Sequence, residues 1–68
     1  MIDTIKIKKR MDDMGIKQKD LAALLGIATP TLNLKLNNKR PIDLEQAEMI
    51  ASYLKISDKQ YRDYFFAW

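Results

Sequence analysis

The chain has 68 residues and a formal net charge of +3, with no cysteine and no histidine. A chain of this length builds one small core, and without cysteine neither a disulfide nor a thiolate metal site can support it. No apolar run approaches the roughly 20 residues of a membrane span, and the N-terminus lacks the apolar region of a signal peptide. We therefore expect one cytoplasmic domain over residues 1–68, with no membrane partner.

The positive charge is concentrated in the first part of the chain. Residues 1–40 carry nine Lys or Arg against four Asp, which leaves +5, and residues 41–68 carry three against five acidic residues, which leaves −2. A basic segment is typical of nucleic-acid binding. A solvated charged surface is the alternative, so the motifs have to decide between the two.

The sequence predicts a first helix over residues 4–14 that ends at Gly15. Its apolar residues follow the i, i+4, i+7 spacing of one buried face, at Ile7, Met11 and Met14. A second helix is expected over residues 17–25, and its buried residues would be Leu21, Ala22 and Leu25. Gly26 adopts a positive φ at little cost, so it can end this helix and turn the chain within a few residues.

A third helix is expected over residues 30–37, with Thr29 as its N-cap and Pro30 as its first residue. Leu32 and Leu36 would face the core. Two helices joined by so tight a turn form a helix-turn-helix, whose second helix can enter the major groove of DNA.

Two more helices complete the predicted fold. Asp43 and Gln46 stand at capping-box positions before a fourth helix, and Ser57 and Gln60 do so before a fifth. The apolar face of the fourth helix would hold Leu44, Ala47, Ile50, Ala51 and Leu54. The fifth would carry an aromatic stripe of Tyr61, Tyr64, Phe65 and Trp68. Because no segment predicts a stable strand, we expect an all-α, compact, five-helix domain with the helix-turn-helix at helices two and three.

In the second predicted helix and the turn, Gln18 is followed by Leu21-Ala22, Gly26 and the apolar Ile27. With this segment as the most specific part, nearly the whole chain resembles the Cro and repressor-like (Xre-type) helix-turn-helix family, which implies a compact five-helix repressor-like domain. The segments 36–41 and 64–67 resemble the end of the recognition helix and the end of the chain in small phage Cro-like proteins. One departure is Lys35, because an apolar residue is usual three positions after Leu32. A recognition helix rotated from the common pattern is therefore an open alternative.

Base contacts are expected on the outer side of the third helix. An Asn33 amide can pair with N6 and N7 of adenine, and the side chains of Thr29, Pro30 and Leu34 can touch a thymine methyl. The alternatives are that Thr29 and Pro30 only begin the helix and that Leu34 packs against a neighbour.

The resemblance implies that Gln18 contacts a phosphate and helps to position the recognition helix, and a helix N-terminus suits a phosphate physically. The alternative is an exposed polar residue near a cap. Further phosphate contacts are expected from the other basic and polar side chains of the motif: Lys17, Lys19, Thr31, Lys35, Asn37, Lys39 and Arg40. Solvation is the alternative for each lysine, and helix capping is the alternative for Thr31. Asn38 tolerates the left-handed conformation of a helix end, which favours a structural role.

Five of the six aromatic residues lie between Tyr61 and Trp68. A domain this small can hardly bury all five, and exposed aromatic side chains often mark an interface. We therefore expect a weak homodimer through Phe65, Phe66 and Trp68, with core packing of these residues as the alternative.

Together these features predict a sequence-specific, double-stranded DNA-binding transcriptional regulator, a phage Cro-like repressor that acts as a weak dimer on a near-palindromic operator. If phage-encoded, it would act in the bacterial host cytoplasm. The alternatives are a helical protein-interaction module, or an antitoxin or excision regulator with the same fold. An enzyme is not expected, because imidazole and thiol groups are absent and the adjacent Asp12 and Asp13 point in different directions. No cofactor, metal or small-molecule ligand is expected.

Overall fold

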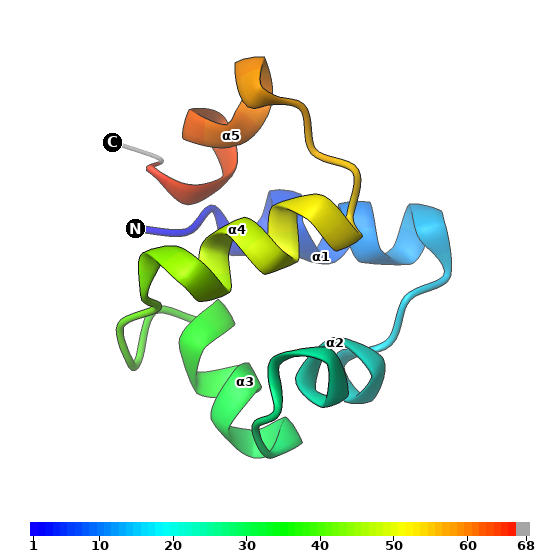
Figure 1. The fold of residues 1–68 in the computed structure, drawn as a ribbon, viewed down its shortest axis with the longest axis vertical. Coiled ribbons are helices and arrows are strands. Elements are labelled where there is room, and N and C mark those ends of the chain that lie inside the picture. Colours follow the sequence, from blue (N-terminus) through cyan, green and yellow to red (C-terminus); the bar gives the residue numbers. More distant parts are fainter. Residues whose placement is uncertain (67–68) are drawn as a thin grey trace.

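A computed structural model describes residues 1–66, and within that range the chain folds into five helices and no strands (Figure 1). The helices are α1 (Thr4–Met14), α2 (Gln18–Leu25), α3 (Thr29–Leu36), α4 (Leu44–Tyr53) and α5 (Asp58–Phe65). The predicted all-α fold is confirmed, and α2 and α3 form the expected helix-turn-helix. In the described part of the chain every helix is too short or too polar to span a membrane.

Left-handed glycines end the first two helices. Gly15 has φ of 68° and Gly26 has φ of 70°, a region that costs other residues energy. After each glycine the chain folds back onto the helix: the Ile16 amide donates to the Met11 carbonyl at 2.8 Å, and the Ile27 amide donates to the Ala22 carbonyl at 3.1 Å. The predicted role of Gly26 in the turn is therefore confirmed.

The start of α3 differs from the prediction by one residue. Ala28 is the N-cap, with extended backbone angles, and its carbonyl accepts from the Leu32 amide at 3.1 Å. Thr29 is the first helical residue, so its predicted role as N-cap is wrong. Pro30 is tolerated at the second position because amides in the first helical turn need no partner within the helix.

The other caps vary in how closely they follow the sequence patterns. Asp43 caps α4 as predicted, because its carboxylate accepts from the Gln46 amide at 2.7 Å. Ser57 is the N-cap of α5, but its hydroxyl donates to the Gln60 side chain at 3.4 Å and accepts no backbone amide. At the start of α2 the Asp20 carboxylate accepts from the Lys17 amide at 3.3 Å, which makes Lys17 the N-cap.

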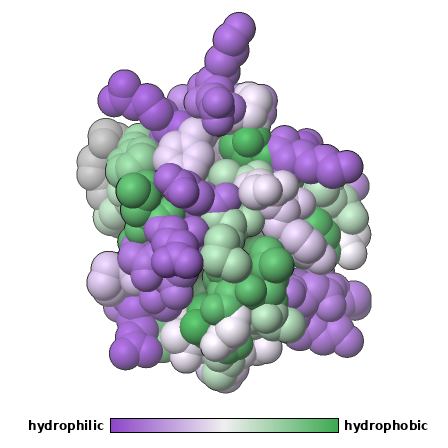
Figure 2. All heavy atoms as spheres, viewed as in Figure 1, coloured by the Kyte–Doolittle hydropathy of each residue, from purple (hydrophilic) through white to green (hydrophobic). Residues whose placement is uncertain are grey.

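All five helices contribute to one core. Leu32 and Leu36 of α3 are fully buried, as predicted, and Ala22 is small enough for α2 to pack closely against α3. The buried core consists of Ile2, Ile7, Met11, Leu21, Ala22, Leu32, Leu36, Ala47, Ile50, Ala51, Leu54, Ile56 and Phe65. In Figure 2 hydrophilic side chains lie mostly around the edge of the visible face, while apolar side chains gather where α2 and α3 meet below α4.

The aromatic residues at the end of the chain are divided between core and surface. Phe65 is only 4% exposed and its ring lies 4.8 Å from that of Tyr61, whereas Phe66 is 54% exposed. Phe65 is therefore part of the monomer core, and the expectation that it is spare apolar surface is wrong. Trp68 lies outside the described residues.

Candidate nucleic-acid interface

The turn between α2 and α3 presents one side of α3 to solvent. Only residues 26–28 separate the two helices, and Leu32 and Leu36 point into the core from the opposite side of α3. Because side chains four residues apart share a helix face, this burial leaves the opposite side of α3 facing outward. The recognition helix thus has the orientation predicted from Leu32 and Leu36.

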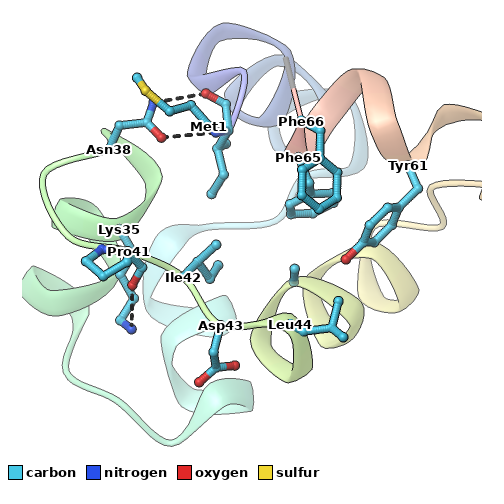
Figure 3. A pocket seen from close by; sticks show the side chains of 12 residues that line it. Met1, Lys35, Asn38, Pro41, Ile42, Asp43, Leu44, Tyr61, Phe65 and Phe66 are labelled. Atoms are coloured by element: carbon cyan, nitrogen blue, oxygen red, sulfur yellow. Dashed lines mark hydrogen bonds between the residues drawn. The ribbon is translucent and has the colours of Figure 1, made fainter. Parts of the chain in front are cut away.

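Lys35 is compatible with that orientation because its ammonium turns back onto the protein. It donates to the Gln46 side chain at 2.9 Å. It also donates to the Pro41 carbonyl at 3.2 Å (Figure 3). A lysine stem can lie along apolar surface while its charged end reaches polar groups, so Lys35 occupies a position where an apolar residue is usual. Two of its three donors are engaged within the protein, which argues against the expected phosphate contact.

The structure brings the expected base-contact residues together on the outward side of α3. Thr29, Pro30, Asn33 and Leu34 are all exposed, and Leu34 is 40% exposed. Thr29 and Asn33 are one turn apart, as are Pro30 and Leu34, so the four side chains form a continuous patch. The patch combines a polar amide with apolar groups, which suits the edges of A·T pairs in the major groove.

Asn33 is held by Gln18 from the start of α2. The Asn33 Nδ2 donates to the Gln18 Oε1 at 3.2 Å, and this bond fixes the Asn33 side chain between the two helices. The Asn33 amide retains its carbonyl oxygen and a second N–H group, the pair that adenine requires. Sequence reasoning selected both residues but missed their contact, because residues 15 positions apart show no local pattern.

Four exposed cations flank the outward patch. Lys17 and Lys19 lie at the N-terminal end of α2, and Lys39 and Arg40 follow the end of α3. Within residues 1–66 the only ion pair joins Lys9 to Asp13, so these four cations have no carboxylate partner in the described part of the chain. Unpaired cations at both edges of a recognition helix are suited to contact phosphates.

Two polar candidates are less available than the sequence suggested. The side-chain amide of Asn37 donates to the backbone carbonyl of Asn33 at 2.8 Å, and its oxygen accepts from the Lys8 ammonium at 3.4 Å. Thr31 is half-buried on α3. By contrast, the structural role expected for Asn38 is confirmed, because its φ is 61°.

The Tyr61 hydroxyl, whose pKa is shifted, lies in α5 and away from the α3 surface. Burial, and then the nearby Glu48 carboxylate, raise the pKa of Tyr61 above its ordinary value. The Tyr61 hydroxyl has no hydrogen-bond partner among the described residues, and its ring packs against Phe65 in α5. In the same part of the chain, no group of three or more acidic side chains is placed to hold a metal ion.

An outward recognition helix, a fixed amide and flanking cations define a helix-turn-helix DNA-binding domain. Residues 6–58, from the first turn of α1 to the start of α5, match the family described as the Cro/C1-type HTH DNA-binding domain. The chain belongs to this family, which confirms the resemblance inferred from the segment around Gln18. Comparison with curated proteins and with solved structures found no match.

Proposed function

We propose that the protein is a phage Cro-like repressor that binds one near-palindromic operator as a weak dimer in the cytoplasm of a bacterial host. The observation that carries this proposal is the outward patch of α3, in which Gln18 holds Asn33 beside Thr29, Pro30 and Leu34. Family membership supports DNA binding itself. The patch supports recognition of sequence, because it presents both a hydrogen-bonding amide and methyl-contacting groups.

In this proposal, different residues of the motif recognise bases and contact phosphates. Asn33 reads a base pair, while Gln18 holds the Asn33 side chain and faces a phosphate at the positive end of α2. Lys17, Lys39 and Arg40 contact phosphates without distinguishing sequences. Base preference and total affinity are therefore separable by mutation.

Asn33→Ala is expected to relax the preference at one base position and to cost roughly 1–3 kcal/mol of binding free energy. Arg40→Ala is the matched control, because it removes a phosphate contact and should weaken all duplexes about equally. Competition between duplexes that differ at single base pairs measures both effects. A uniform loss for Asn33→Ala, with every preference retained, would show that α3 reads DNA through other residues.

The proposed dimer contact lies at a groove beside Phe66. The groove has a volume of about 520 Å³ and separates α5 from the N-terminal end of α4 (Figure 3). Three of its lining side chains are large, apolar and at least half exposed: Met1, Leu44 and Phe66. An exposed apolar patch of this kind is suited to contact the same patch of a second copy in a two-fold interface. We therefore place Phe66, and not Phe65, at the proposed contact with the second copy.

Phe66→Ala is expected to reduce the cooperative occupancy of two half-sites while leaving the helical content unchanged, because Phe66 lies outside the core. Phe65→Ala is the contrasting variant, because it removes core packing and should lower the thermal stability. Quantitative footprinting and circular dichroism measure these effects. Sedimentation that finds one copy of the intact chain on a full operator would contradict the dimer.

A further inference from the structure

The first three residues form a strap across the end of α3. The Ile2 amide donates to the Asn38 Oδ1 at 3.0 Å, and the Asn38 Nδ2 donates back to the Ile2 carbonyl at 2.9 Å. Figure 3 shows this pair of bonds at the edge of the groove. The Asn38 side-chain amide therefore binds both the backbone N–H and the backbone carbonyl of Ile2, a residue 36 positions away.

The strap is itself fixed to the rest of the molecule. Ile2 is buried in the core, and the Asp3 amide donates to the Tyr64 carbonyl of α5 at 2.7 Å. At the start of α1 the Thr4 hydroxyl donates to the carbonyl of Leu36, the last residue of α3. The strap thus joins the C-terminal end of the recognition helix to α5.

Asn38 immediately precedes the two cations that follow α3. The amides of Lys39 and Arg40 both donate to the Leu34 carbonyl, at 2.8 and 3.3 Å, so the chain folds tightly back onto the helix here. The left-handed backbone of Asn38 sets the direction of this turn. Glycine would adopt that backbone more easily, so the turn alone does not account for the bonds that the Asn38 side chain makes to Ile2 and to the Thr4 hydroxyl.

We infer that Asn38 is a positioning residue for DNA binding. By hydrogen-bonding to the strap, the Asn38 side chain fixes the segment that carries Lys39 and Arg40. Both cations are then directed toward phosphates already in the free protein. Without these bonds the segment would have to lose conformational entropy to reach the phosphates, so fewer of its phosphate contacts would form in the complex. This inference rests on the proposed DNA-binding function.

Asn38→Gly tests the inference, because glycine keeps the positive φ, leaves the charge unchanged and removes the side-chain bonds to Ile2 and to the Thr4 hydroxyl. We expect affinity for a duplex selected by the wild-type protein to fall about tenfold, as for the loss of a net hydrogen bond or two. The slope of log K against log salt should become shallower by about one to two for each copy, because each lost phosphate contact changes it by about 0.9. Base preference should be retained.

Ile50→Val is the matched control, because it trims a fully buried side chain of α4 and leaves the strap intact. Its melting temperature should fall while the salt slope stays at the wild-type value. Thr4→Val keeps the side-chain volume and removes the hydroxyl that donates to the Leu36 carbonyl and accepts from the Asn38 Nδ2 at 3.4 Å. It should make the slope shallower by less than Asn38→Gly does, and it decides the question if Asn38→Gly does not fold.

A folded Asn38→Gly protein with wild-type affinity and salt slope would overturn the inference and leave Asn38 with a structural role only. If Asn38→Gly does not fold, a wild-type slope for Thr4→Val would overturn it equally. Failure of the wild-type chain to bind any duplex would instead overturn the proposed function.

Discussion

Raising the salt concentration from about 50 to 200 mM is expected to weaken the complex of two copies with operator DNA by roughly 10³- to 10⁵-fold. Each copy presents Lys17, Lys19, Lys39 and Arg40 without a carboxylate partner in the described part of the chain. Lysine and arginine displace condensed cations from phosphates, and those cations rebind when salt is added. Fluorescence anisotropy with a labelled duplex at several salt concentrations measures the slope.

Single substitutions assign that slope to particular residues. Arg40→Ala should make the slope shallower by about 0.9 for each copy that binds. Lys59→Ala removes the same charge from α5, on the opposite side of the molecule from α3 in Figure 1, and should leave the slope unchanged. An affinity that does not depend on salt would contradict the assignment of these cations to phosphates.

The second large effect is expected for Leu36→Ala, which should lower the free energy of unfolding by about 2–5 kcal/mol. Leu36 is fully buried at the end of α3, next to the strap, so its loss leaves a cavity where several elements meet. A domain this small has a free energy of unfolding near the low end of about 5–15 kcal/mol, so a loss at the upper end of the expected range would unfold about half of the population. Urea denaturation followed by circular dichroism measures the change.

Leu34→Ala provides the comparison on the same helix. Leu34 is 40% exposed on the outward side of α3, and substitutions at such positions change stability far less than core truncations do. It should therefore fold nearly as well as the wild type while losing affinity for DNA. If Leu36→Ala and Leu34→Ala lowered the free energy of unfolding equally, both sides of α3 would have to pack against the rest of the protein.

The parts of the fold that were predictable depend on local chemistry. Gly26 ends α2 because a positive φ is easiest for glycine, and Asp43 caps α4 because its carboxylate accepts a nearby amide. Leu32 and Leu36 are four residues apart and so share the buried face of α3. Each of these signals lies within a few residues of the structure that it determines.

The parts that were missed depend on groups distant in sequence or on backbone alone. Ala28 caps α3 without any side-chain signal. Two hydrogen-bonded pairs, Asn33 with Gln18 and Asn38 with Ile2, join segments that meet only after folding. Such contacts leave no periodic pattern, although the polar residues involved were already visible as candidates.

Phe65 and Phe66 illustrate the same limit to sequence reasoning on one short segment. Both lie at the end of α5, and composition indicated only that some of the aromatic residues would stay exposed. The packing of α5 against α1 places Phe65 inside and leaves its neighbour outside. Phe65 is the last residue of α5, whereas Phe66 is its C-cap with a non-helical φ of −133°, so the end of the helix separates the core residue from the surface one.

Selection of bound sequences from a pool of random duplexes measures recognition of DNA by this chain most directly. We expect the wild-type protein to enrich one motif, with two related halves about 34–36 Å apart along the DNA. In a parallel selection, Asn33→Ala should enrich the same motif with one position in each half relaxed. A wild-type pool that remains random after repeated rounds at low salt would contradict sequence-specific recognition by the α3 surface.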